Sequence, residues 1–390
     1  MTRGRIYRCR KMLTKSICIA LASLMLSGVP TLHTNANTIQ TGIDVSKWQG
    51  KIDWNAVAKS GVSFAFIKAG SLKSGIDDYF FANMLGAQAA GIKTGVYIYS
   101  YATNVHEAAM EAQFVLNLVQ NLEVSYPIVW DVEDKVQQSL SANTLALMAN
   151  TFCALVEAEG YHPMVYANKY WFNSKIGNIH YDKWVAQWGN KLDIPDASVW
   201  QYSSTGRING IKGDVDLNFS LKDYSTTIVD TGFVARKGAI YYYENYKMKK
   251  GWLDLNGARY LFDGTGKLYT GWLPTENGTF YFKPDGTMAL GLTLVDNKLY
   301  YFDSNGLMLT GLHELAGLKF FFGADGVMYT GFLDFPDGRR YFATDGHMET
   351  GMVTIGNHIY YFDTNGVMQT GVVDIGGVLC TFDEEGRFIG

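Results

Sequence analysis

Glycine recurs every 20 residues in the carboxy-terminal part of this 390-residue chain, from Gly251 to Gly371. An aromatic column keeps the same spacing and comprises Tyr242, Phe262, Phe282, Phe302, Phe322, Phe342, Phe362 and Phe382. A unit of this length cannot bury an apolar core by itself, so neighbouring units must stack to shield the column from water. The period therefore predicts an array of like units over residues 230–390.

Each repeat is predicted to be a β-hairpin. In one unit, Lys298 to Phe302 has the composition of a strand, and Asp303-Ser304-Asn305-Gly306 supplies a tight turn in which glycine takes the positive φ. Met308 follows two residues after this turn, and most other units also place methionine there. Because an isolated hairpin is only marginally stable in water, we expect the units to form an all-β repeat solenoid of β-hairpins.

The amino terminus has the pattern of a leader. Basic residues between Arg3 and Lys15 precede an apolar stretch from Ile17 to Leu26, and Thr34-Asn35-Ala36 offers small residues to a signal peptidase. Residues 1–36 are therefore predicted to be a signal peptide, and the protein to be secreted and extracellular. No apolar run reaches the roughly 18 residues that span a bilayer, so we expect no transmembrane segment in the mature protein.

Charge and cysteine content exclude several classes of protein. Loss of residues 1–36 would take the formal net charge from −4 to −10, because six basic residues and no acidic one lie there. An acidic chain lacks the clustered cations that bind phosphate, so no nucleic-acid partner is expected. The two remaining cysteines, Cys153 and Cys380, fall in different predicted domains and make no disulfide framework.

Residues 38–224 alternate between strand and helix patterns. Apolar strand-like runs and helical patterns follow one another over 62–69, 77–90, 93–101, 105–122, 126–134, 141–159 and 163–170. After Tyr170 only strands are expected, over 184–188, 199–203 and 215–219. This order predicts an α/β fold, an incomplete TIM-like (β/α)5β3 barrel, whose chemistry would sit at the carboxyl ends of the strands.

Acidic residues follow these predicted strands. Asp44 ends the first strand, Asp131 and Glu133 end a strongly apolar one, and Asp216 lies at the end of the last. Burial and mutual repulsion should raise the pKa of one carboxyl of the Asp131–Glu133 pair, leaving an acid beside an anion. Hydrolysis of a glycosidic bond needs these two groups. Solvated loop carboxylates or helix N-caps are the alternative, which Asp134 fits best.

Taken together, these motifs resemble glycoside hydrolase family 25, the muramidases often called Chalaropsis-type lysozymes. The resemblance covers residues 42–219 and rests on Gly42–Gly50, Phe66–Ala69, Ala90–Tyr97, Trp130–Glu133, Trp200–Ser203 and Val215–Asn218. It implies hydrolysis of the β-1,4 bond between N-acetylmuramic acid and N-acetylglucosamine in peptidoglycan. It also implies that Glu133 is the general acid, that Asp131 orients or stabilises the reacting N-acetyl group or its cation, and that Asp44 and Asp216 line the floor.

Two features of this domain stay open. Many family members carry an acidic residue shortly after the Lys68-Ala69 pair, where this chain has Gly70 to Gly75, so its sugar subsites could differ. The substrate-binding candidates either stack on sugar rings or belong to the core, and they are Tyr97, Tyr99, Tyr166, Trp188 and Tyr202.

The repeats resemble the cell-wall-binding repeats of Gram-positive surface proteins, which bind choline, glucan or surface glycans. A choline cage works best with tryptophan, yet only Trp252 and Trp272 follow the repeat glycine. Units with Tyr-Tyr-Phe and few tryptophans look more like the carbohydrate-binding repeats at the ends of large clostridial toxins, and this resemblance favours a wall polysaccharide over a choline-type ligand. Tyr301, Phe321 and Tyr361 alternate with the core column, so these three and the two tryptophans are the candidate wall-ligand residues.

Other chemistries find little support in the sequence. The histidines after residue 36 show no zinc-ligand spacing, so no metal and no cofactor are expected. The sequence therefore predicts a secreted peptidoglycan hydrolase that is held non-covalently on a bacterial cell wall by its repeats. A non-catalytic glycan-binding adhesin, or a glycosidase acting on another N-acetylated glycan, is the alternative.

Overall fold

The computed structural model describes residues 39–390. The predicted signal peptide lies outside the described residues. Among residues 39–390, none of the helices combines the length and the apolar composition needed to cross a membrane.

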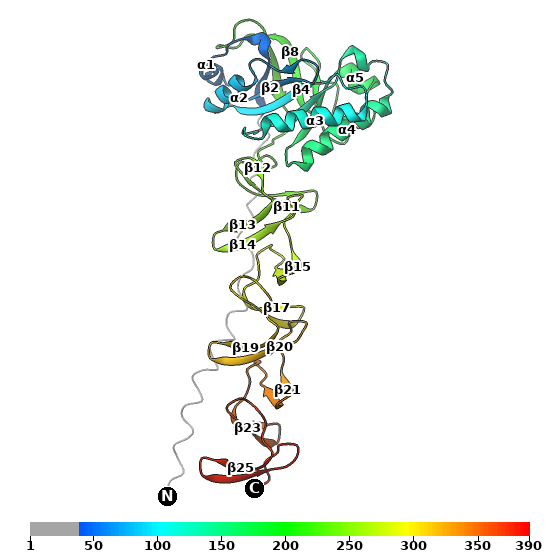
Figure 1. The fold of residues 1–390 in the computed structure, drawn as a ribbon. Helices are drawn as coiled ribbons and strands as arrows, with labels where there is room; N and C mark the ends of the chain where they lie inside the picture. Colours follow the sequence, from blue (N-terminus) through cyan, green and yellow to red (C-terminus); the bar gives the residue numbers. More distant parts are fainter. Residues whose placement is uncertain (1–38) are drawn as a thin grey trace. The chain divides into compact units, whose positions relative to one another are not determined.

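Eight strands close a barrel (Figure 1). They are β1 (Gln40–Val45), β2 (Phe64–Ser71), β4 (Lys93–Tyr99), β5 (Ile128–Asp131), β6 (Pro163–Asn168), β7 (Asp182–Ala186), β8 (Ala197–Gly206) and β9 (Val215–Ser220). The first seven run parallel, and β9 pairs antiparallel with both β8 and β1, which closes the sheet. The short β3 (Gly75–Ile76) adds to the edge of β2. The predicted α/β barrel is thus confirmed as a closed eight-stranded one.

Helices follow the strands only in the first part of the barrel. They are α1 (Trp54–Lys59), α2 (Phe80–Ala89), α3 (Val105–Val119), α4 (Ala142–Ala158) and α5 (Lys169–Ser174), with short 3-10 turns η1 (Lys47–Gln49) and η2 (Lys135–Gln137). Side-chain caps fix their starts: Asn104 accepts from the backbone of α3, and Ser141 from that of α4. Asp134 caps η2, in keeping with its reading as an N-cap.

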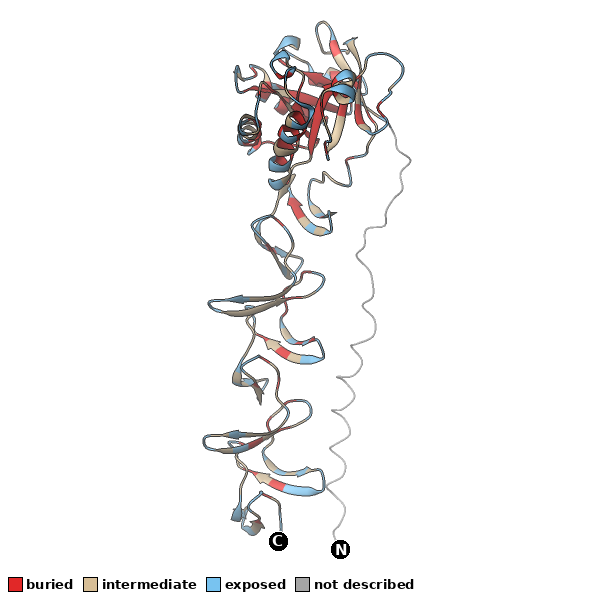
Figure 2. Cartoon of the chain, turned by 90° about the vertical axis from the view of Figure 1, so that its right-hand side faces the viewer, coloured by how far each residue is buried: buried red, intermediate tan, exposed pale blue. Residues whose placement is uncertain are grey.

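Aromatic rings fill the barrel interior. Phe66 stacks on Trp184 with ring centroids 4.3 Å apart, and Phe64 stacks on Tyr126 at 4.5 Å. A second apolar core lies between the strands and the helices. Figure 2 shows the buried residues concentrated in this domain, whereas each hairpin carries only short buried stretches. The barrel is therefore a packed core that leaves only the strand ends available for a site.

The repeat region is a series of hairpins. It opens with β10 (Gly232–Arg236), β11 (Ala239–Glu244) and β12 (Lys247–Met248). Seven two-stranded hairpins follow: β13 (Gly251–Leu255) with β14 (Ala258–Phe262), β15 (Gly271–Thr275) with β16 (Gly278–Phe282), β17 (Gly291–Val295) with β18 (Lys298–Phe302), β19 (Gly311–Leu315) with β20 (Leu318–Phe322), β21 (Gly331–Phe335) with β22 (Gly338–Phe342), β23 (Gly351–Ile355) with β24 (His358–Phe362), and β25 (Gly371–Ile375) with β26 (Val378–Phe382).

The hairpin turn lies elsewhere than predicted. The strands of one unit are joined by Asp296 and Asn297, both at positive φ, because a two-residue turn of that kind matches the twist of paired strands. The turn at 303–306 comes after the second strand. It returns the chain for a single antiparallel bridge between Phe302 and Met308.

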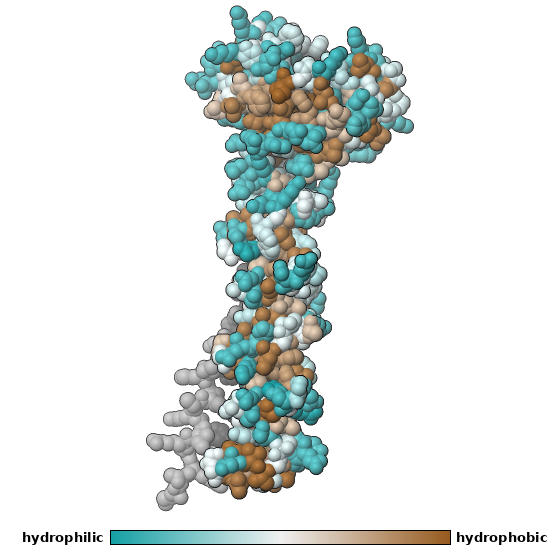
Figure 3. Space-filling model, in the orientation of Figure 1, coloured by the Kyte–Doolittle hydropathy of each residue, from teal (hydrophilic) through white to brown (hydrophobic). Residues whose placement is uncertain are grey.

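Neighbouring hairpins dock through one apolar residue of each unit, which is methionine in all but the first and last of the two-stranded units. The backbone N–H of Met308 donates to the carbonyl of Thr279 in the preceding hairpin, at 2.9 Å. The Met308 side chain lies against Gly326 of the following unit, so closely that a Cβ there would meet its sulfur. Phe302 and Phe322 are fully buried, as the aromatic column requires. Apolar side chains nevertheless remain on the surface of the hairpins (Figure 3), and Leu294 and Leu312 are among the exposed ones.

Candidate active site

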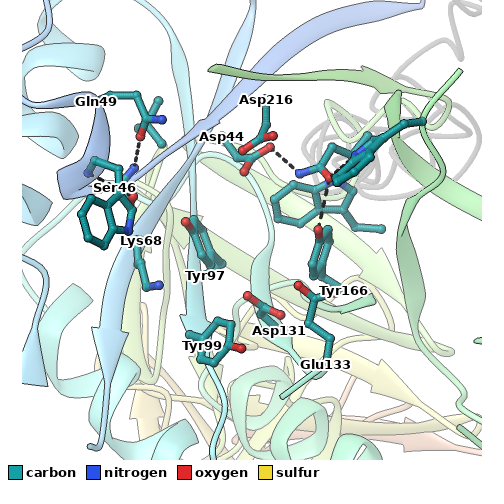
Figure 4. Close-up of a pocket in the computed structure, with 15 residues that line it drawn as sticks. Asp44, Ser46, Gln49, Lys68, Tyr97, Tyr99, Asp131, Glu133, Tyr166 and Asp216 are labelled. Carbon is teal, nitrogen blue, oxygen red and sulfur yellow. Dashed lines mark hydrogen bonds between the residues drawn. The ribbon is translucent and has the colours of Figure 1, made fainter. Parts of the chain in front are cut away.

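A pocket of about 270 Å³ opens at the carboxyl ends of the parallel strands, and all four predicted acids line it (Figure 4). Their side chains come from strands distant in sequence, β1, β5 and β9, or from the residues just after them. Four of the five predicted sugar-contact residues also line it: Tyr97, Tyr99, Tyr166 and Trp188. The structure therefore brings most of the predicted site into one cleft.

Asp44 and Asp216 form a pair on the pocket floor. They are direct cross-strand partners in the β1–β9 ladder, so their side chains share a face. Asp216 lies near the start of β9, and the prediction that it ends its strand was wrong. It still reaches the site because β9 runs antiparallel to the other strands and begins where they end.

The Asp44 carboxyl is held by buried amides. Its Oδ2 accepts hydrogen bonds from Gln201 Nε2 at 3.0 Å and Asn218 Nδ2 at 2.8 Å. Burial raises its pKa well above the ordinary value, and the charge of Asp216 raises it further, while the two amides act in the opposite direction. Burial also raises the pKa of Asp216, which is lowered by its hydrogen bond with Asp44. The pKa of Asp44 is therefore raised more strongly than that of Asp216.

Asp131 and Glu133 stand at the end of β5. Burial and then the neighbouring Glu133 raise the pKa of Asp131 well above its usual range. Its Oδ1 is buried and has no hydrogen-bond partner among the described residues. Burial likewise raises the pKa of Glu133, whose Oε2 accepts from Asn168 Nδ2 at 3.4 Å. The site thus contains two neighbouring carboxyls with raised pKa values, and one of them has a buried oxygen with no hydrogen-bond partner among the described residues.

Lys68 is a site residue to which the sequence assigned no role. It lies on β2 opposite Tyr97, and its ammonium group sits 4.8 Å from the ring centroid of Tyr99 and 5.8 Å from that of Tyr97. Its charge opposes the rise in the pKa of Asp131. The motif Phe66–Ala69 contained the signal, since a lysine at the end of a buried strand needs a partner there.

The aromatic candidates differ in how they are placed. Tyr166 is buried and donates from its hydroxyl to Gln201 Oε1 at 3.1 Å, and Tyr99 donates to Asp134 Oδ2 at 3.0 Å. Trp188 is 65% exposed and donates to the same Gln201 oxygen at 3.2 Å. Tyr202 lies outside the pocket lining and stacks on Phe219. Trp188 is therefore the candidate best placed for a sugar face.

A buried polar network supports β5 on the side that faces α3. Glu111 of α3 is 1% exposed, and it accepts from the Trp130 indole at 2.7 Å and from the backbone N–H of Tyr101 at 3.0 Å. Buried Gln137 donates to Ser100 Oγ at 3.1 Å, which joins the loops after β4 and β5. Since Trp130 precedes Asp131, this network holds the end of β5 in place. Nothing in the helical pattern around Glu111 distinguished it from a surface acid.

The repeat candidates are only partly free. Trp252 is 44% exposed, and the Arg259 guanidinium, paired with Asp254, covers its ring at 5.7 Å. The other candidates contact rings of their own or the next hairpin: Trp272 contacts Tyr281 and Tyr300, Tyr301 contacts Phe322, Phe321 contacts Phe342, and Tyr361 contacts Phe382. Across residues 39–390 there is no group of three His, Cys, Asp or Glu placed to hold a metal ion.

Comparison with known proteins gives two family matches. The family model "Glycosyl hydrolases family 25" matches residues 43–211, and "Putative cell wall binding repeat" matches residues 294–308 and 350–368. An uncharacterized protein of Escherichia coli O157:H7, YegX, is 32% identical over 48% of this chain and 71% of its own length. Lysozyme M1 of Streptomyces globisporus is 34% identical over 45% of this chain and 66% of its own. The solved structure of the modular Cpl-1 endolysin with a peptidoglycan analogue is 23% identical, covers 80% of this chain and 95% of its own, and has a TM-score of 0.40.

Proposed function

This chain belongs to glycosyl hydrolase family 25, and from that premise we propose that it is a peptidoglycan hydrolase. The bond cleaved is the β-1,4 linkage between N-acetylmuramic acid and N-acetylglucosamine. The observation that carries this proposal is the pair at the end of β5, where Glu133 has a raised pKa and the neighbouring Asp131 keeps a buried oxygen without a partner. Similarity to a lysozyme of Streptomyces globisporus supports the same reaction.

The chemistry follows from the protonation of these groups. Glu133, kept protonated by burial, gives its proton to the glycosidic oxygen as the bond to the sugar carbon breaks. The electron pair leaves with that oxygen, and positive charge develops on the sugar ring. Asp131 then either stabilises the charge or accepts the N–H of the N-acetyl group with its free oxygen. Attack of water, whose proton returns to the Glu133 carboxylate, completes hydrolysis.

The floor pair holds the substrate. With one proton shared between them, Asp44 and Asp216 would present a donor and an acceptor to sugar hydroxyls, and the buried amides of Gln201 and Asn218 keep Asp44 in position. Substrate-binding roles for Tyr97, Tyr99, Tyr166 and Trp188 are part of the proposal because these side chains line the same pocket. Tyr202 has weaker support, since it lies outside the pocket lining.

The repeats are proposed to hold the enzyme on the wall. We assign residues 38–224 to catalysis and residues 230–390 to wall binding, and five strand–helix pairs followed by three strands support the (β/α)5β3 description. The match to a cell-wall-binding repeat supports a wall polysaccharide or choline-type ligand. Weak sites in several units would add through multivalency and raise the local concentration of substrate. The leader-like residues 1–36 support export.

The test is mass spectrometry of the reducing ends that the full chain releases from purified peptidoglycan. The wild type is expected to yield fragments ending in N-acetylmuramic acid. The Glu133→Gln variant should release these fragments at least about 10²-fold more slowly. Glu123→Gln, which changes an exposed carboxyl in the loop between α3 and β5, serves as the matched control and should keep full activity. If the wild type releases no fragments but still binds the wall, the chain is a glycan-binding adhesin and the proposed hydrolase activity is wrong. Release from chitin alone would identify a different N-acetylated glycan.

A further inference from the structure

Trp48 is exposed to solvent at the edge of the pocket. Its side chain is 81% exposed, although Trp54, Trp130 and Trp184 of the same domain are at most 6% exposed. Tryptophan carries the largest apolar surface of any side chain, so a fully displayed indole beside a polar cleft indicates a contact surface rather than a packing role. Trp48 lines the same pocket as the four acids.

The loop that displays Trp48 is fixed from several directions. Ser46 and Gln49 form a reciprocal capping box around η1, in which the backbone N–H of Ser46 donates to Gln49 Oε1 at 2.9 Å. The backbone N–H of Lys47 donates at 3.0 Å to Asp77, a buried carboxyl on the loop after β3. The backbone that carries the indole is therefore fixed, so ligand binding has only the Trp48 side chain left to order at this turn.

The pocket itself is too small for a glycan strand. Its volume of about 270 Å³ lies just below the roughly 300–1,000 Å³ range of pockets that enclose a drug-sized ligand. A strand of several sugars must therefore extend over the rim on both sides of the reacting bond. Figure 4 shows Ser46 and Gln49 on one side of the pocket and Tyr166 on the opposite side.

The rim carries an indole on each of two separate loops. Trp48 follows β1, and Trp188 follows β7, with β8 and β9 between those strands in the sheet order. Trp188 is anchored by its hydrogen bond to Gln201, whereas Trp48 has both ring faces available because so little of it is covered. Pyranose rings present flat C–H faces that pack on such rings.

We propose that Trp48 is an aromatic platform for a sugar of the glycan strand outside the reacting pair, so that the enzyme selects long strands over short fragments. This inference rests on the proposed function, because the ligand is the same glycan. In this proposal Trp48 determines which glycan length binds best, and the acids cleave the bond.

The test compares Trp48→Ala, Trp48→Phe and wild type on peptide-free glycans, using an octasaccharide and the shortest fragment that the wild type cleaves. Trp48→Ala is expected to raise KM for the octasaccharide about three- to tenfold, because one aromatic stack on a sugar is lost. The kcat for the octasaccharide and both kinetic constants for the short fragment should stay unchanged. Trp48→Phe should restore most of the affinity. Tyr170→Ala, another exposed aromatic of this domain that does not line the pocket, is the matched control.

Other results would overturn the assignment. An equal loss on both glycans, or a fall in kcat alone, would show that Trp48 only supports the loop; no loss on either glycan would show that it touches no sugar. Calorimetric binding of the octasaccharide in a Glu133→Gln background separates this from failure of the proposed function. If the wild type cleaves nothing but the octasaccharide still binds more weakly after Trp48→Ala, only the reaction is wrong. If the octasaccharide binds neither protein, both are wrong.

Discussion

Replacing Asp44 by asparagine and by alanine measures the proton on the pocket floor. Asparagine has nearly the same shape, so its Oδ1 can accept from Gln201 and Asn218 while its Nδ2 donates to Asp216. A neutral Asp44 makes the same set of bonds with its own proton. The asparagine variant should therefore differ from wild type by less than about 1 kcal/mol in the free energy of unfolding at or below about pH 4, where the unfolded chain also keeps this proton.

Alanine removes the acceptor for both amides. Each unpaired buried donor costs about 1–3 kcal/mol, and water from the pocket can satisfy part of that loss, so we expect Asp44→Ala to lose about 2–4 kcal/mol at the same low pH. The two variants thus separate loss of the hydrogen bonds from loss of the carboxyl. A small effect of asparagine beside a large effect of alanine is the expected pattern.

The pH dependence gives the sign of the effect. Burial raises the pKa of Asp44 in the folded state, so the folded chain keeps a proton that the unfolded chain loses above about pH 4. The stability that this proton contributes is complete below that pH and is lost as the pH rises toward the folded pKa. The asparagine variant has no such loss, so it should gain on the wild type as the pH rises.

Urea unfolding followed by tryptophan fluorescence measures both effects, because most of the nine tryptophans lie in the barrel. Curves from pH 4 to pH 7 give the difference in unfolding free energy for each variant. If Asp44→Asn loses as much as Asp44→Ala, and the loss grows toward neutral pH, Asp44 is ionised in the fold and the proton assignment is wrong.

Further substitutions test the surroundings of Asp131 and the packing of the repeats. Burial raises the pKa of Asp131 and Lys68 opposes that rise, so Lys68→Met should move the acidic limb of the kcat/KM profile to higher pH; an unmoved limb would show that the ammonium does not act on this carboxyl. Gly326 has φ +77°, and an added Cβ would lie 2.2 Å from the Met308 sulfur, whereas Gly331 has φ +97° and open space around it. Urea unfolding followed by circular dichroism measures the loss in the free energy of unfolding for each variant. Gly331→Ala should lose about 1–2 kcal/mol, the backbone cost alone, and Gly326→Ala about 1–3 kcal/mol more. Equal losses in the two variants would refute the methionine contact.

Much of the site could be predicted from sequence because strand ends converge in a barrel. Asp44 and the Asp131–Glu133 pair follow apolar runs, and parallel strands bring such positions to one edge without any further information. Asp216 lies beside these carboxyls for a different reason. Its strand runs the opposite way, and the apolar pattern of a short strand carries no sign of direction.

The missed residues are those whose role depends on a partner from another element. Glu111 has the surroundings of a surface acid in its own helix, and only the Trp130 indole from β5 makes it a buried support. Trp48 looks like a core residue in the sequence, yet the capping box around it and Asp77 turn it outward. Local composition contains neither fact.

The hairpin turn was misplaced for a local reason. Asp303-Ser304-Asn305-Gly306 has strong turn residues, but Asp296 and Asn297 form the two-residue turn that joins the longer strands. Both segments are turns, and the choice between them depends on which flanking residues pair. The 20-residue period was enough to predict stacked hairpins, whichever turn joined the strands.

The methionine that docks each hairpin onto its neighbours bears on how the array can change over evolution. In the two-stranded units, Met or an equivalent residue donates its N–H to a backbone carbonyl of the preceding unit, and its side chain lies against a turn glycine of the following unit wherever one follows. Recombination that inserts or removes one whole 20-residue unit would therefore rejoin surfaces that already fit each other. A break at any other length would put a polar turn residue where the sulfur belongs. Copy number can drift within a lineage while the barrel stays untouched.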